Sequence, residues 1–408
     1  MKKIALLHYA YPPNIGGVEL LLQEQAHILK DLGYNVVVLT GDGEENDLDI
    51  TLHKLPELQS ILNTNPRLQE KIIDKGIIDE EFYQTADQIR KTLEIHLQDV
   101  NVVIVHNMLT VYRNLPFIYA FREYLTTQPG KKVIGWVHDH MYIGMDRVRT
   151  DEVVKTELER ELLTTPLTNV EYVVISDTFK KQLLKVMPIP EKKLRVIPDG
   201  MNIKKFLELD KEIWKVINEY NLLKAFPLIL SPVNILERKN IEYSLSIVKE
   251  LKKHHPDILY LISGQTSRHR QTLQYFDKIK KMIRDFELDK NVLFLGKDFT
   301  RSLEDSEVHD LYQIADLIFY FSKSENFGLP ILEAALSKTP IFVSDLRVFH
   351  EVGDKYINYI DYKTVSPDKA ADKIKNFIGN NSLLNLNYQA RTNYNLEVII
   401  REKLVPLL

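Results

Sequence analysis

The sequence contains no cysteine, no low-complexity tract and no apolar run that approaches the ~20 residues of a membrane span. Without cysteine, disulfide bonds, thiolate metal sites and thiol nucleophiles are excluded, while the redox compartment stays open. The apolar run that follows Met1 ends at His8, which is too short for the apolar region of a signal peptide. We therefore expect a soluble, cytoplasmic protein.

A strong charge of one sign is also missing. The 408 residues carry a formal net charge of −4, and no basic stripe is interleaved with aromatic residues. We therefore expect no nucleic-acid partner. The length, together with 44% hydrophobic residues, is sufficient for two globular domains that each have a full core.

Apolar runs alternate with helical patterns twice along the chain. Residues 3–9 predict a buried strand, residues 18–32 an amphipathic helix and residues 36–40 the next strand. Continuous apolar strands joined by helices are typical of parallel sheets that are covered on both faces. The further predicted strands are 101–106, 132–138, 171–176, 227–233, 258–264, 291–297, 315–322 and 340–344.

This pattern predicts an α/β protein with two doubly wound, Rossmann-like domains that face each other across a cleft. We expect domains at 1–200 and 201–385, and a C-terminal helix at 386–408 that packs back on the N-terminal domain. Residues 44–98 are charged and favour helix, so we interpret them as an insertion or an extended crossover. Residues 202–225 follow a Pro-Asp-Gly turn and are the expected linker. A ligand would bind at the carboxyl ends of strands from both domains.

The stretch SENFGLPILEAAL places two glutamates around one helix start. If Pro330 takes the first helical position, Glu325 lies on the preceding loop and Glu333 lies in the first helical turn. The unpaired backbone N–H groups around Gly328 and Leu329, together with the helix dipole, would form an anion site. The stretch therefore predicts a site for a ligand that carries both hydroxyls and phosphate.

Several motifs, in the same order along most of the chain, resemble glycosyltransferase family 4, whose members use nucleotide sugars and have the GT-B fold. The motifs are PPNIGGVE in the first loop, VISDTFKKQLL followed by VIPDGMN, ERKN at 237–240, and the pair Glu325 and Glu333, with seven residues between them, within ENFGLPILEA. The resemblance implies a retaining hexosyltransferase that moves a hexose from a UDP- or GDP-sugar to a soluble small-molecule or saccharide acceptor. It also implies that the leaving phosphate takes the acceptor proton, and that no metal or other cofactor is needed.

The resemblance gives roles to the residues of the donor site. Glu325 would hold hydroxyls of the donor sugar and Glu333 those of the ribose, since carboxylates accept hydrogen bonds. Lys239 would neutralise the leaving diphosphate, and a fixed cation there stabilises the transition state more than the ground state. The other expected donor-binding residues are Gly16, Gly17, Asn234, Arg238, Asn326, Phe327, Gly328 and Leu329.

Two parts of this donor site carry alternatives. The backbone amides of Gly16 and Gly17 can approach a diphosphate or an acceptor, or the pair can be an ordinary strand-to-helix turn. Where the family usually has an arginine shortly before the lysine, this chain has Asn234, which supplies no charged fork. Arg238 is adjacent to Lys239, but we expect neighbouring side chains to point in different directions. The phosphate clamp is therefore the least complete part of the resemblance.

The N-terminal domain holds the expected acceptor side. His138 ends the strand KVIGWVH and matches a histidine that in the family faces the donor sugar. When neutral it would donate a hydrogen bond to the 6-hydroxyl of the sugar, and it can also transfer a proton. Asp139 would orient His138, and His106 and Asn107 would line the acceptor pocket. The expected catalytic residues are His138, Lys239 and Glu325.

Other functions and partners stay open at this point. One is a phosphorylase or nucleotide-sugar isomerase on the same scaffold, and another is a catalytically impaired, nucleotide-binding partner subunit, for which Asn234 is the one indication. The basic run 268–284 leaves membrane association open, although Asp277 interrupts it and acidic segments of the N-terminal half favour a soluble acceptor. The sequence gives no indication of the oligomeric state.

Overall fold

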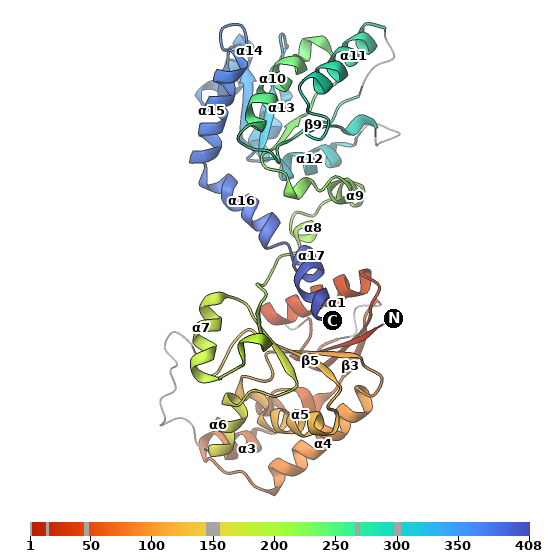
Figure 1. The fold of residues 1–408 in the computed structure, drawn as a ribbon, viewed down its shortest axis with the longest axis vertical. Coiled ribbons are helices and arrows are strands. Elements are labelled where there is room, and N and C mark those ends of the chain that lie inside the picture. Colours follow the sequence, from red (N-terminus) through yellow and green to blue (C-terminus); the bar gives the residue numbers. More distant parts are fainter. Residues whose placement is uncertain (1, 14–15, 45–48, 144–155, 266–269, 298–302) are drawn as a thin grey trace. The chain divides into compact units, whose positions relative to one another are not determined.

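The computed structural model describes residues 2–13, 16–44, 49–143, 156–265, 270–297 and 303–408. The chain forms two compact α/β units (Figure 1). Unit 1 comprises Met1–Met201 and Leu396–Leu408, and unit 2 comprises Asn202–Asn395. Each unit is built on one sheet whose paired strands run parallel, which confirms the predicted α/β class with two doubly wound sheets. Asn14, Ile15 and residues 268–269 of the motifs above lie outside the described residues.

The sheet of unit 1 has seven strands in the order β3-β2-β1-β4-β5-β6-β7. Its central strands are buried on both faces, because apolar residues follow one another without alternation. The order reverses between β1 and β4, so the loops after these strands flank a topological switch point. The strands are β1 (Lys3–Ala10), β2 (Asn35–Asp42), β3 (Thr51–Lys54), β4 (Val102–His106), β5 (Lys132–Val137), β6 (Val170–Val174) and β7 (Leu194–Val196).

Successive residues of β1 serve two separate core layers in unit 1. Ile4 and Leu6 pack with helix α1 (Gly17–Asp31) and with the C-terminal segment 396–408, which contains α17 (Leu396–Ile399). Ala5 and Leu7 point to the other face, which α4 (Glu80–His96) and α5 (Leu115–Thr127) cover. The remaining helices of this unit are α2 (Ile61–Thr64), α3 (Pro66–Gln69), α6 (Glu157–Thr164) and α7 (Asp177–Val186).

The sheet of unit 2 has six strands in the order β10-β9-β8-β11-β12-β13, which reverses between β8 and β11. The strands are β8 (Leu228–Ser231), β9 (Leu259–Ile262), β10 (Val292–Phe294), β11 (Leu317–Tyr320), β12 (Ile341–Ser344) and β13 (Asn358–Ile360). The helices are α8 (Ile203–Phe206), α9 (Lys211–Glu219), α10 (Ile241–Lys252), α11 (Arg270–Asp285), α12 (Asp305–Ile314), α13 (Leu329–Leu336), α14 (Arg347–Gly353), α15 (Pro367–Asn380) and α16 (Ser382–Asn393) (Figure 1).

A buried ion pair holds the end of α16 in unit 2. Both terminal nitrogens of Arg391 donate to the carboxylate of Asp316, at 2.9 and 2.7 Å, and further donors bond the carbonyls of Leu223 and Ala225. Asp316 also accepts the backbone N–H of Leu228 at 2.7 Å. Every charge of the pair is therefore matched by hydrogen bonds, as burial requires.

Of three expectations about the chain's organisation, one is wrong and two hold in part. The expected linker 202–225 is wrong, because it forms α8 and α9 and packs in the core of unit 2, where Ile213 is fully buried. Residues 49–98 form the edge strand β3, parallel to β2, and then α2, α3 and α4 on the way to β4, so they are the expected helix-rich crossover apart from β3. The segment 386–408 is not one helix, since α16 belongs to unit 2, but residues 396–408 pack on the N-terminal unit as expected.

None of the helices in the described residues combines the length and the apolar character needed to cross a membrane. Within the basic run, α11 buries Tyr275, Ile279 and Ile283 on its inner face. Its charged residues therefore lie on the outer face of an ordinary amphipathic helix.

Candidate functional site

The candidate donor site lies at the carboxyl ends of β8 and β11, where the strand order of unit 2 reverses. Glu325 follows β11, while Arg238 and Lys239 lie in a 3₁₀ turn after β8. The Oε1 atom of Glu325 accepts hydrogen bonds from Lys239 Nζ at 2.5 Å and from Arg238 Nη1 at 2.9 Å. Asn240 ends the turn in the left-handed conformation, at φ 54°, and leads the chain into α10. Two motifs far apart in sequence therefore converge on one carboxylate.

The position of Arg238 corrects an expectation. We expected it to point away from Lys239, but both side chains reach the same oxygen of Glu325. The arginine side chain is 48% exposed and long enough to curve back to the carboxylate, whereas Lys239 is 11% exposed. The site consequently contains two cations beside one carboxylate.

Burial and hydrogen bonding act in opposite directions on the ionisable groups of this site. Burial alone would raise the pKa of Glu325, but the hydrogen bond from Lys239 and the charges of Lys239 and Arg238 outweigh it and hold that pKa below its usual range. Burial lowers the pKa of Lys239, and Glu325 opposes this effect. Burial, with Glu325 nearby, raises the pKa of Tyr320, whose ring centre lies 5.1 Å from Lys239 Nζ. An ionised carboxylate, two cations and a neutral phenol give the site a net positive charge that suits an anion.

A pocket of about 480 Å³ surrounds these groups, and its other wall is the start of helix α13. Gly328 is the N-cap residue at φ 114°, and a side chain there would lie 3.0 Å from the ring of Phe349. No side chain among the described residues caps this helix start, so the N-terminus keeps its preference for anions. The residues that line the pocket are Arg238, Lys239, Tyr320, Ser324, Glu325, Asn326, Phe327, Gly328, Leu329 and Pro330.

Glu333 lies in the second turn of α13, not in the first turn as predicted. The helix begins at Leu329, so Pro330 takes the second helical position and Glu333 the fifth. Glu333 is exposed, and its Oε2 accepts a hydrogen bond from the Tyr312 hydroxyl at 2.7 Å. Burial, together with Glu333, raises the pKa of Tyr312, so this hydroxyl keeps its hydrogen. Tyr312 thereby orients the carboxylate of Glu333.

Asn234 lies apart from the residues that line this pocket. Its Oδ1 accepts the backbone N–H of Gln265 at 3.1 Å, so it connects the loops that follow β8 and β9. Gly264 allows these loops to touch, because a side chain there would collide with the backbone of Val233. The structure therefore gives Asn234 a loop-bridging contact, while Arg238 takes the place beside Lys239.

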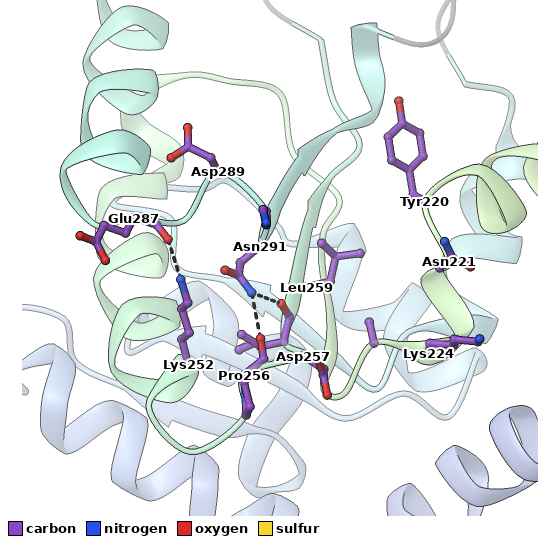
Figure 2. A pocket seen from close by; sticks show the side chains of 13 residues that line it. Tyr220, Asn221, Lys224, Lys252, Pro256, Asp257, Leu259, Glu287, Asp289 and Asn291 are labelled. Atoms are coloured by element: carbon purple, nitrogen blue, oxygen red, sulfur yellow. Dashed lines mark hydrogen bonds between the residues drawn. The ribbon is translucent and has the colours of Figure 1, made fainter.

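A larger pocket, of about 570 Å³, lies at the opposite, amino ends of β8, β9 and β10. Figure 2 shows its lining, in which Lys252 donates to the backbone oxygen of Glu287 and Asn291 donates to the oxygens of Pro256 and Ile258. These bonds connect turns of the protein itself. Helix C-termini, which disfavour anions, point to this end of the sheet. We therefore place the functional site at the smaller pocket.

In unit 1, the predicted histidines lie at the carboxyl ends of β4 and β5. His106 is fully buried, so it does not line an open pocket as we expected. Its Nδ1 lies 3.2 Å from Nε2 of His138, and its Nε2 lies 2.8 Å from Oε1 of the buried Gln25. Burial, followed by the neighbouring histidines, holds the pKa of His106 well below its usual range. His106 therefore contacts His138 rather than a ligand.

Asn107 and Asp139 also take positions that differ from the expected ones. The Oδ1 atom of Asn107 accepts the backbone N–H groups of His138 and Asp139, at 3.2 and 2.8 Å, and thus shapes the loop after β5. Asp139 accepts the N–H of His140 and does not orient His138. The carboxylate near His138 is that of Asp199, whose Oδ2 lies 3.5 Å from His138 Nδ1.

The turn at Gly16 and Gly17 contains a carboxylate, that of Glu19. Gly16 is the N-cap residue of α1, and a side chain there would collide with the carboxylate of Glu19. Glu19 Oε1 lies 3.5 Å from Nε2 of His8, and the proximity of His8 lowers the pKa of Glu19. At Gly17 a side chain would meet open space. Because a carboxylate already occupies this helix N-terminus, the turn suits hydroxyl groups better than a diphosphate.

Sequence reasoning missed Tyr320, Tyr312, Gln25, Glu19 and Asp199. Asp199 stands inside the VIPDGMN motif and Glu19 inside PPNIGGVE, so the motifs contained both without singling them out. The two tyrosines and Gln25 are buried in regular elements and give no local signal. Across the described part of the chain, no group of three or more His, Asp or Glu side chains is placed to hold a metal ion. Metal independence stays a prediction.

Comparison with known proteins gives matches along both units. The model of Glycosyltransferase Family 4 matches residues 15–205, and that of Glycosyl transferases group 1 matches residues 212–395. A mannosylglucosylglycerate synthase of Petrotoga mobilis is 24% identical over 370 residues, which are 85% of this chain and 83% of that protein. An alpha-galactosylglucosyldiacylglycerol synthase of Streptococcus pneumoniae is 22% identical over 75% of this chain and 77% of that protein.

Among solved structures, that of Anabaena HepE in complex with UDP and glucose aligns with 100% of this chain and 97% of its own, at 14% identity and a TM-score of 0.35. Such a low TM-score carries no argument, and the fold follows from the two parallel sheets and the family match. With family matches that extend through both units, the chain belongs to glycosyltransferase family 4 and is a glycosyltransferase of the GT-B fold.

Proposed function

We propose that this glycosyltransferase moves a hexose from a nucleotide diphosphate sugar to a soluble small-molecule or saccharide acceptor, with retention of the anomeric configuration. The observation that carries the proposal is the convergence of Lys239, Arg238 and Glu325 in one pocket at the start of α13. Two cations and a helix N-terminus match a diphosphate, and a carboxylate matches the hydroxyls of a sugar. A nucleotide diphosphate sugar contains both.

The two cations have a catalytic role in this proposal. When the bond between sugar and phosphate breaks, negative charge grows on the leaving diphosphate, and fixed cations stabilise it more than they stabilise the bound donor. The diphosphate accepts hydrogen bonds from Lys239 and Arg238. Glu325 then becomes available to accept hydrogen bonds from hydroxyls of the sugar. Arg238 beside Lys239 supplies a second cation where Asn234 does not, which supports an active enzyme over an impaired subunit.

Glu333 and unit 1 complete the proposal. Glu333, whose carboxylate Tyr312 orients, accepts hydrogen bonds from the ribose hydroxyls. Retention follows if the leaving phosphate takes the proton of the acceptor hydroxyl on the same face of the sugar. His138 and the turn at Gly17 bind the acceptor side, where the carboxylate of Glu19 favours hydroxyls over a second anion. The product named for the Petrotoga relative, mannosylglucosylglycerate, agrees with a soluble acceptor, whereas the product named for the Streptococcus relative is a diacylglycerol glycolipid.

A thermal-shift panel of UDP, GDP, ADP, dTDP and CDP tests the donor site. A ligand at about 100 times its Kd adds about 2.7 kcal/mol to the stability of the folded state. We expect one diphosphate to raise the Tm of the wild type and not that of Glu333→Ala. Glu351→Ala, an exposed glutamate on the neighbouring α14, is the matched control and should keep the full shift. No shift with any of the five nucleotides would contradict the donor-site assignment.

Retention has a separate test. Once the donor is known, an acceptor screen followed by proton NMR of the product gives the anomeric configuration directly. The proposal expects the configuration of the donor, and an inverted product would overturn this part while leaving the donor site intact.

A further inference from the structure

A buried chain of hydrogen bonds leads from helix α1 to His138. Oε1 of Gln25 lies 2.8 Å from Nε2 of His106, and Nδ1 of His106 lies 3.2 Å from Nε2 of His138. Gln25 and His106 are fully buried, and the side chain of His138 is 7% exposed. Water therefore does not replace these hydrogen bonds, and each hydrogen position depends on the next group.

The hydrogen positions follow from the chemistry of the groups. An amide oxygen only accepts, so the contact with Gln25 requires a hydrogen on Nε2 of His106. His106 is neutral in its buried position and holds one ring hydrogen, so its Nδ1 is an acceptor. The hydrogen between the two rings must then come from Nε2 of His138. A neutral His138 consequently has its lone pair on Nδ1, the atom 3.5 Å from Asp199 Oδ2.

Packing against Trp136 holds the rings of His106 and His138 in the orientation that these hydrogen bonds require. The ring of Trp136 is nearly parallel to those of His106 and His138, at angles of 17° and 10° and centre distances of 5.4 and 6.2 Å. The carbonyl oxygen of His106 is fixed as well, because it accepts from Nδ1 of His8 at 2.8 Å. Neither histidine can therefore exchange its two nitrogens by a simple ring flip without losing these contacts.

We propose that Gln25 and His106 are positioning residues that fix the hydrogen of neutral His138 on Nε2 and leave Nδ1, on the side of Asp199, as its hydrogen-bond acceptor. This reverses the polarity expected from sequence, where a neutral His138 donates to a sugar hydroxyl. In its catalytic consequence the inference rests on the proposed function, but the tautomer itself does not. Gln25 touches no substrate and acts through His106.

Histidine tautomers are read directly from long-range ¹H–¹⁵N correlation spectra of the unliganded protein labelled with ¹⁵N-histidine. The signals of His138 are assigned by their loss in His138→Gln. We expect the hydrogen on Nε2 of both His106 and His138. His140 is an internal reference, since its Nε2 lies 2.9 Å from the carbonyl of Leu163 and its Nδ1 accepts the N–H of Tyr142. A hydrogen on Nδ1 of neutral wild-type His138 would overturn the proposal.

Two substitutions of Gln25 sharpen the test. Gln25→Glu keeps an accepting oxygen and should preserve the tautomers of His106 and His138. Gln25→Met removes the acceptor, so these hydrogens should no longer be held on Nε2. The signals of His140 should stay unchanged in both variants. If the amide nitrogen of Gln25 instead donated a hydrogen bond to His106, Gln25→Glu would change the tautomers of His106 and His138, and the proposal would fail. In donor turnover, Gln25→Met should lower kcat by at least about 10-fold, which is a part of the about 10²–10⁴-fold that a positioned acid–base group contributes, with KM nearly unchanged. Altered tautomers with unchanged kcat would refute the catalytic consequence alone.

Discussion

Replacing Lys239 with methionine tests whether the two cations of unit 2 bind the diphosphate. Methionine keeps the apolar stem and removes the charge. In the structure Lys239 Nζ donates to Glu325 Oε1 at 2.5 Å, and each of the two side chains is 11% exposed. A hydrogen bond to a charged group contributes about 1.5–3 kcal/mol. Because Arg238 still bonds the same oxygen, we expect the free energy of unfolding to fall by about 1.5–2 kcal/mol, the lower part of that range.

The expected effect on catalysis is larger than the effect on stability. Loss of one group that stabilises developing negative charge costs about 10²–10³ in rate, or about 2.7–4 kcal/mol. The assay is release of nucleoside diphosphate from the sugar donor, with kcat and KM determined separately. We expect most of the loss in kcat, because the diphosphate carries more charge in the transition state than in the bound donor.

Lys323→Met is the matched control for this experiment. Lys323 Nζ donates to Glu242 Oε1 at 3.0 Å, its side chain is 34% exposed, and it lies outside the residues that line the pocket. We expect a modest loss of stability and an unchanged rate. The reasoning is refuted if Lys239→Met loses less than about tenfold in kcat, which corresponds to about 1.4 kcal/mol, or if both lysine variants lose equally.

Three further predictions concern the glycine, the buried ion pair and the carboxylate. Gly328→Ala places a side chain at φ 114° against an aromatic ring, so urea denaturation should show a loss of about 1–3 kcal/mol. Gly379→Ala, in α15 with open space around the new atom, should instead gain about 0.5–1 kcal/mol, and equal effects would contradict the strain argument. Arg391→Met leaves the carboxylate of Asp316 buried without its cation and should cost about 3–5 kcal/mol, and a loss typical of an exposed pair, below about 1 kcal/mol, would refute this. The pKa of Glu325 is lower in the folded state than in the unfolded chain, so its charge contributes stability above about pH 4.3 that is lost as the pH falls through the folded value. The Tm difference between wild type and Glu325→Gln should therefore shrink on acidification. A difference that grows as the pH falls would contradict a lowered pKa of Glu325 in the folded state.

Much of the fold was predictable because the central strands are continuous apolar runs. The edge strands β3, β7 and β13 were not predicted, since three or four partly exposed residues give too little periodic signal. The segment 202–225 was mistaken for a linker because its charges dominate its composition. Only the burial of residues at helical spacing, such as Ile213 and Val216, distinguishes it as part of a core.

Local motifs singled out most of the residues that line the proposed donor site, but they did not predict the contacts among these residues. Lys239 and Glu325 are 86 positions apart, and only the parallel sheet brings the loops after β8 and β11 together. Sequence reasoning also chose Asp139 as the partner of His138 because the two are adjacent. Successive side chains at a strand end point to opposite sides, so the nearby carboxylate comes from another segment, as Asp199.

Hydrogen–deuterium exchange with and without the nucleotide sugar tests the central claim most directly, because it reports which part of unit 2 the donor covers. The sugar nucleotide is the one whose base the thermal-shift panel identifies. We predict slower exchange in peptides that contain residues 236–241 and 322–333, around Lys239 and Glu325. Protection confined to residues 220–225, 252–259 and 287–291, which form the larger pocket at the other end of the sheet, would contradict the account.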